Sequence, residues 1–216
     1  MAEVADLVGA VAPVRQRLEA RHAAREHALA ASRDAIRAAA NAIRAVHRGE
    51  AVRVDALLSE ARDHLSRAVE VSEPHPEVRY AGFVGDAAKE VAEAELTRAA
   101  IAGEPLPDPD AAGVDEVAWL HGLAETVGEL RRASLDRVRT GDLETGEHYL
   151  ALMQEILAAL VTIDVPDGLS RGLRRATDAA RAITERTRGD LTTAVGQRDL
   201  KRALEAHRAV LEQASG

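Results

Sequence analysis

The chain has 216 residues, a net charge of −8 and no cysteine. The lack of cysteine excludes disulfides, thiolate metal sites and cysteine nucleophiles, so any chemistry must come from carboxylates, imidazoles or hydroxyls. The acidic balance argues against broad, unspecific attraction to nucleic acid or to anionic membranes, although it leaves room for a local basic channel.

Arginine supplies almost all of the positive charge, because Lys89 and Lys201 are the only lysines among 28 basic residues. This composition resembles that of a salt-loving archaeon or of a GC-rich organism, in which an acidic surface maintains solubility. No stretch approaches the roughly 20 apolar residues that span a bilayer. We therefore expect a soluble, cytoplasmic protein.

The residue pattern predicts an all-α fold, because alanine, leucine, glutamate and arginine dominate and strict alternation is scarce. Prolines and glycines mark the expected helix ends. The predicted helices cover residues 13–48, 53–71, 76–102, 115–140, 143–162, 168–188 and 191–213. The loop GEPLPDPDAAG (103–113) is too short for a flexible interdomain linker, so one domain over residues 1–216 is expected, a seven-helix antiparallel bundle.

Motifs of common enzyme classes are missing: there is no GxGxxG, phosphate-binding GxxxxGK[ST], HExxH, calcium loop or GxSxG. The eight histidines form no HxH or HxxxH pair and are interpreted mainly as surface or hydrogen-bonded residues. His121 is kept as a candidate, because it precedes Glu125 by four residues and shares its helical face.

Two carboxylates, Glu125 and Glu129, lie four residues apart in LHGLAETVGEL. On a helical wheel they fall roughly opposite the apolar stripe that begins at Trp119 and Leu123. Periodicity alone therefore favours a solvated helix face over a functional site.

A second pair, Glu90 and Glu93, lies three residues apart in KEVAEAE. Helices joined by one short loop are expected to be antiparallel neighbours, so this pair and the Glu125 and Glu129 pair can meet. Converging carboxylates repel one another unless a cation or protons intervene. Such a set suits Mg²⁺ or Mn²⁺, although spacing alone does not prove that the two pairs converge.

The arginines between positions 131 and 188 allow two interpretations. Salt pairing with the abundant acidic residues is the simpler one. The alternative is a lining that follows an RNA backbone, for which planar guanidinium groups are well shaped. Arg132, Arg186 and Arg188 are the candidates, and Arg132 shares a side of its helix with Glu125.

Four segments, taken in order, resemble the translin and translin-associated factor X family. They are SRDAIRAAANAIRAVHR (32–48), HPEVRYAGFVGDAAKEVAEA (75–94), WLHGLAETVGELRR (119–132) and RATDAARAITERTRG (175–189). Together with a Gly-Asp turn at 141 and 142, the match covers most of residues 15–190.

The resemblance implies an all-α protein that assembles into a hollow, octameric barrel and binds single-stranded RNA or DNA inside it. The translin-associated factor X branch is a Mg²⁺-dependent ribonuclease, and archaeal members resemble this branch. A helix face that points away from the monomer core can then line the interior of a homo-oligomer. The implied partners are single-stranded RNA, DNA as a second possibility, and further copies of the chain, with Mg²⁺ or Mn²⁺ as the cofactor.

The resemblance also assigns Glu90, Glu93, Glu125 and Glu129 as metal ligands and catalytic residues. The family string Glu-aromatic-Val-Glu-Ala corresponds here to residues 90–94. The string Gly-Val-Ala-Asp-Leu-Thr-Gly-Glu-Leu corresponds to residues 122–130, with Glu125 in place of aspartate. The extra methylene keeps the charge but extends the reach, which places the catalytic rate in question more than metal binding.

Three hypotheses follow. The first is a divalent-metal-dependent endoribonuclease acting on single-stranded RNA, with Arg132, Arg186, Arg188 and His121 at the backbone. The second is a translin-like nucleic-acid-binding protein in which Glu125 marks lost activity. The third is a helical scaffold with neither property, which would show no salt-sensitive RNA binding.

Overall fold

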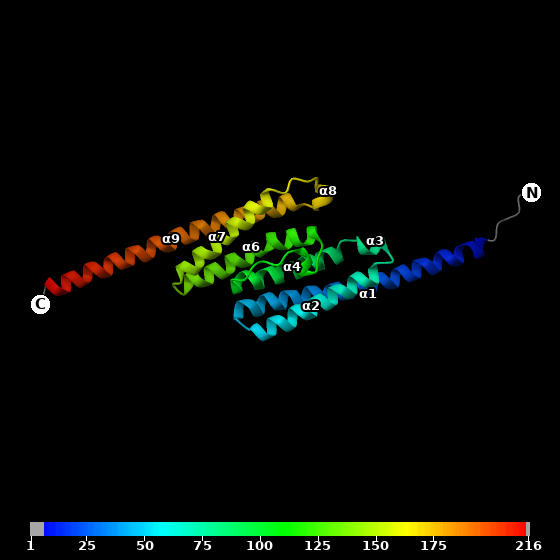
Figure 1. Cartoon of the computed structure of the whole chain (residues 1–216), viewed down its shortest axis with the longest axis horizontal. Helices are drawn as coiled ribbons and strands as arrows, with labels where there is room; N and C mark the ends of the chain where they lie inside the picture. The colour runs from blue at the N-terminus through cyan, green and yellow to red at the C-terminus, as the bar shows by residue number, and fades with distance from the viewer. Residues whose placement is uncertain (1–6, 215–216) are drawn as a thin grey trace, which may run out of the picture. The chain divides into compact units, whose positions relative to one another are not determined.

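The computed structural model describes residues 7–214, and all regular structure in this range is helical (Figure 1). In chain order the helices are α1 (Leu7–Arg48), α2 (Ala51–Ser72), α3 (Pro76–Arg79), α4 (Phe83–Ala102), α5 (Pro109–Ala112), α6 (Glu116–Arg139), α7 (Leu143–Val161), α8 (Asp167–Ser170) and α9 (Leu173–Ala214). The predicted all-α class is confirmed. None of the described helices combines the length and the apolar character that crossing a bilayer requires.

The chain divides into two compact units. The first comprises the residues up to 99 together with 105–122, and the second comprises 100–104 and the residues from 123 onward. Helices α4 and α6 each begin in the first unit and end in the second. A single domain over the whole chain therefore stays a prediction.

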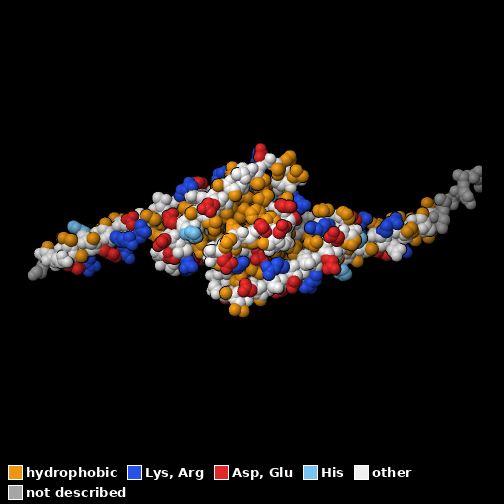
Figure 2. All heavy atoms as spheres, in the orientation of Figure 1, with side chains coloured by type: hydrophobic (Ala, Val, Ile, Leu, Met, Phe, Trp, Pro, Cys, Tyr) orange, Lys and Arg blue, Asp and Glu red, His pale blue; other side chains and the backbone are white. Residues whose placement is uncertain are grey.

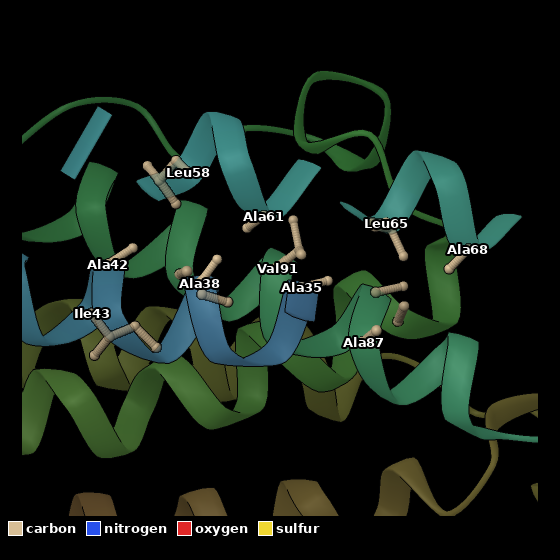
Figure 3. Packing of buried hydrophobic residues seen from close by; sticks show 14 of the residues in the cluster. Ala35, Ala38, Ala42, Ile43, Leu58, Ala61, Leu65, Ala68, Ala87 and Val91 are labelled. Carbon is tan, nitrogen blue, oxygen red and sulfur yellow. The ribbon is translucent and has the colours of Figure 1, made fainter. Parts of the chain in front are cut away.

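The first unit is built on the pairing of α1 with α2, which a turn at Gly49 reverses. Buried residues repeat at alternating spacings of four and three along α2, which aligns them in one stripe. They are Val54, Leu58, Ala61, Leu65, Ala68 and Ser72. The facing stripe of α1 consists largely of alanine, so the two backbones can approach closely. Ala87 and Val91 of α4 complete this core (Figure 3).

Glycines in the left-handed region end several helices where they were expected to. Gly49, at φ 70°, ends α1, and the amide of Glu50 donates to the carbonyl of Ala45. The predicted continuous helix over 76–102 is wrong, because Gly82 adopts φ 102° and separates α3 from α4. Pro13 also lies inside α1 rather than at its start.

In the second unit α7 packs against α9, and α9 does not break at Gly189 as the sequence predicted. Its buried residues continue the alternating spacing through that glycine: Leu173, Thr177, Ala180, Thr184, Thr187 and Leu191. Leu191 lies against Gly146 of α7, where an added Cβ would be 3.1 Å from the Leu191 side chain. Packing on both sides of Gly189 thus outweighs its cost of about 1 kcal/mol in a helix.

Candidate metal centre

Helix α4 carries two of the predicted carboxylates, Glu90 and Glu93. Most of its residues between Val84 and Ala100 are buried, among them Val84, Val91 and Leu96. The side chain of Glu90 is 26% exposed, and Glu93 is only 9% exposed. A carboxylate as buried as Glu93 requires hydrogen bonds or a nearby positive charge to offset its lost hydration.

The start of α6 is fixed by contacts from the preceding loop. The Asp115 carboxylate accepts a hydrogen bond of 2.9 Å from the amide of Ala118, which caps the helix. The indole of Trp119 donates at 2.9 Å to the carbonyl of Pro107. These bonds hold the first turns of α6 in place, whereas the helical wheel had placed Trp119 only in the apolar stripe.

Gly122 is the point at which α6 touches α4. A Cβ built on Gly122 would lie 2.7 Å from the Cβ of Ala92, 2.8 Å from the amide nitrogen of Glu93 and 3.0 Å from the carbonyl oxygen of Lys89. Real Cβ atoms essentially never show contacts below 3.0 Å. Only glycine fits between the two helices here, and this role was not recognised from the sequence.

Glu125 follows Gly122 by three residues on the same continuous helix. One carboxylate oxygen from each of Glu90, Glu93 and Glu125 lies within 4.8 Å of the other two. We call these three residues the carboxylate cluster. Three of the four predicted acidic residues are thus brought together, and the longer side chain of Glu125 does not prevent it.

Glu129, the fourth predicted ligand, is not part of this group. It lies one turn beyond Glu125 on α6, is 23% exposed, and one of its oxygens is 3.5 Å from the guanidinium of Arg132. Its role at the metal stays a prediction. The helical wheel had favoured a solvated face for Glu125 and Glu129. In the structure both residues are half-buried.

The donor set of the carboxylate cluster fits a hard divalent cation. All three groups offer carboxylate oxygens, which Mg²⁺, Mn²⁺ and Ca²⁺ prefer, whereas structural zinc sites use cysteine and histidine. Oxygens on opposite sides of one such ion are about 4 to 5 Å apart. A spread of up to 4.8 Å therefore matches one ion.

Lys89 is a further charged group at this site that sequence reasoning missed. Its Nζ lies 3.2 Å from Oε1 of Glu90, and its side chain is 24% exposed. Its rarity was a usable signal, because only two lysines occur in the chain and one of them precedes Glu90 directly. The ammonium offsets part of the negative charge that the cluster gathers.

A separate carboxylate, Glu95, lies on another side of α4 and is satisfied within the protein. Its side chain is 6% exposed, and the guanidinium of Arg62 on α2 donates a short hydrogen bond to it. Burial raises the pKa of Glu95 above its usual value, while the charges of Arg62 and Arg98 act in the opposite direction. This ion pair joins α2 to α4.

The predicted RNA-contacting arginines are exposed but mostly engaged locally. Arg188 pairs with Glu185 at 2.7 Å, and Arg186 donates at 3.2 Å to the carbonyl of Ala182. Figure 2 shows acidic and basic side chains interspersed on the visible face of the C-terminal part of α9. His121 is half-buried. The structure thus places these residues without testing their predicted roles.

Comparisons with known proteins are consistent with the helical fold. AfC3PO, solved alone and in complex with duplex RNA, is 33% identical, with TM-scores of 0.77 and 0.78 over 86% of this chain and 97% and 96% of those chains. Apo-NeC3PO, at 16% identity, shares the fold, with a TM-score of 0.77 over 90% of this chain and 100% of its own.

An uncharacterized protein of Methanocaldococcus jannaschii is 31% identical over 100 residues, which span 46% of this chain and 45% of that protein. No protein-family model matches the chain. The identity to AfC3PO, which extends over nearly the whole of that protein, nevertheless settles the family. The chain belongs to the translin and translin-associated factor X family, in the branch that includes AfC3PO.

Proposed function

We propose that this chain is an RNA-binding, divalent-metal-dependent endoribonuclease that acts on single-stranded RNA within a homo-oligomeric, octameric barrel. The observation that supports the activity best is the carboxylate cluster of Glu90, Glu93 and Glu125. Similarity to AfC3PO, which has been solved with duplex RNA, supports RNA binding. The family, rather than any contact between copies, supports the barrel.

In this proposal Glu90, Glu93 and Glu125 hold Mg²⁺ or Mn²⁺. When bound, such a cation offsets charge that develops on the phosphodiester and makes a water molecule easier to deprotonate. Glu129, one turn from Glu125, is the fourth ligand in this proposal and, with the other three, activates the attacking water. The guanidinium of Arg132 lies 3.5 Å from a carboxylate oxygen of Glu129. Because the Arg132 side chain is half exposed, we propose that it also binds a phosphate oxygen of the RNA.

The deciding experiment is cleavage of a labelled single-stranded RNA with and without Mg²⁺ or Mn²⁺. We expect metal-dependent cleavage by the wild type and a loss of at least about 100-fold in Glu93→Gln, which removes one ligand charge without changing the side-chain size. Glu129→Ala is expected to lose activity as well. Glu70→Gln, an exposed glutamate on α2, is the matched control and should cleave like the wild type.

The alternative is a non-catalytic single-stranded RNA- or DNA-binding protein, which the glutamate at position 125 favours. RNA retention by the wild type without cleavage under any of these metals would establish this alternative and reject the nuclease. Binding should weaken steeply as salt rises, because phosphate contacts release counterions. A duplex of the same sequence, tested in parallel, separates single-strand from duplex recognition.

A further inference from the structure

We propose that Gly122 is a positioning residue that sets the size of the carboxylate cluster and thereby its selectivity for Mg²⁺. This inference rests on the proposed metal site. Gly122 itself contacts no metal and no RNA in the proposal. It acts by fixing how closely α6 approaches α4 beside the three carboxylates.

The geometry at Gly122 leaves no room for a side chain. Two of the three atoms that a Cβ would meet, the amide nitrogen of Glu93 at 2.8 Å and the carbonyl oxygen of Lys89 at 3.0 Å, belong to the backbone of α4. A flexible side chain can rotate away, but backbone atoms of a packed helix cannot. An added Cβ must therefore move one helix relative to the other by several tenths of an ångström or more.

Such a movement acts directly on the metal ligands. Glu93 provides both a cluster carboxylate and one of the backbone atoms that a Cβ at position 122 would meet. Glu125 lies one helical turn from Gly122, so a shift of α6 at that point is transmitted to it with little loss. Widening this contact therefore moves Glu125 away from Glu90 and Glu93.

The two metals respond differently to a wider cluster. Mg²⁺ requires near-ideal octahedral geometry at about 2.0 to 2.1 Å, whereas Ca²⁺ accepts flexible geometry at about 2.3 to 2.6 Å. A cluster held tight by glycine therefore favours Mg²⁺. Enlarging it should cost Mg²⁺ affinity while Ca²⁺ affinity changes little, and general destabilisation of the fold would not produce this difference.

The test is isothermal titration of the full-length protein with Mg²⁺ and with Ca²⁺, with helicity measured by circular dichroism. In Gly122→Ala we expect Mg²⁺ affinity to fall by about 10- to 100-fold and Ca²⁺ affinity by less than about threefold. The matched control is Gly128→Ala on the same helix. Apart from its chain neighbours and the nearby backbone of α6 itself, no atom of the described residues 7–214 lies within 4 Å of a Cβ built there, so both affinities should be unchanged.

A second variant tests the contact itself. The closest atom to the added methyl is the Cβ of Ala92, at 2.7 Å, so Gly122→Ala combined with Ala92→Gly should recover part of the Mg²⁺ affinity. This double variant also replaces the single one as the test if Gly122→Ala does not fold. Unfolding of both variants would overturn the proposal, because the contact would then determine the fold rather than the metal site.

The outcomes separate this inference from the proposed function. If the wild type binds neither metal, the proposed metal site fails and the role of Gly122 fails with it. If the wild type binds Mg²⁺ and folded Gly122→Ala keeps the same ratio of Mg²⁺ to Ca²⁺ affinity, only the role of Gly122 is rejected. Equal losses in Gly122→Ala and Gly128→Ala would reject it too.

Discussion

Helix α4 carries acidic side chains in two different settings. On one side, Glu95 is buried and its counter-charge comes from Arg62, a residue of the same protein. On another, Glu90 and Glu93 gather with Glu125 into a group of three carboxylates, with one ammonium, that of Lys89, close to Glu90. Glu93 and Glu95 are only two residues apart on one helix. Glu95 belongs to an ion pair within the protein, whereas Glu93 belongs to a cluster with the donor set of a cation site.

The difference shows how a carboxylate is recognised as structural or functional. Glu95 faces a long side chain from α2 that ends in a guanidinium, so attraction within the protein offsets part of the cost of burial. At the cluster, three like charges approach within 4.8 Å, and this arrangement is favourable when an additional cation is bound. Each of the following predictions alters one of the two settings and leaves the other unchanged.

The largest expected effect is on the metal dependence of stability. At a free Mg²⁺ concentration about 100 times the dissociation constant, binding to the folded state alone raises the free energy of unfolding by about 2.7 kcal/mol. Glu90→Gln combined with Glu93→Gln should abolish this increase, while Glu95→Gln should keep it. Urea unfolding with and without Mg²⁺ measures it, and an equal increase in all three proteins would contradict the cluster as the binding site.

Removing the guanidinium of Arg62 from its pair with Glu95 should lower the free energy of unfolding by a somewhat smaller amount. In Arg62→Met the apolar stem is kept but the buried Glu95 loses its charged partner. Because Arg62 is 47% exposed, we expect the free energy of unfolding to fall by about 2 kcal/mol, below the usual cost of breaking a fully buried pair. Arg67→Met, at an exposed position of the same helix, is the control and should change stability by less than about 0.5 kcal/mol.

The smallest effect is a pH dependence from Glu95. Burial raises its pKa in the folded state above the value in the unfolded chain, so the folded state binds the proton more tightly. The contribution of Glu95 to stability is therefore fully present below the unfolded pKa and is lost as pH rises through the folded pKa. The stability of the wild type relative to Glu95→Gln should decline across that window in urea unfolding; a rise would show that Arg62 outweighs burial.

Much of the fold could be predicted from local signals. The all-α class, the end of α1 at Gly49 and the presence of a helix close to the bounds of α2 follow from composition and turn chemistry. The break at Gly82 was missed, because the residues around it read as continuous helix. At Gly189 the error was the opposite one: a helix end was predicted, but α9 continues through this glycine because residues on both sides of it pack in the second unit.

The candidate site, like the fold, could be predicted only in part. The sequence alone determined which carboxylates to consider, because their spacing along two helices and the ordered resemblance to translin are properties of the chain. Only the tertiary structure decided that Glu90, Glu93 and Glu125 converge. It also decided that Arg62 forms an ion pair with Glu95 and that position 122 has room only for glycine between α6 and α4. The physical reason is that helical periodicity fixes the face of a residue, whereas distances of a few ångströms between helices depend on the side chains packed at their crossing.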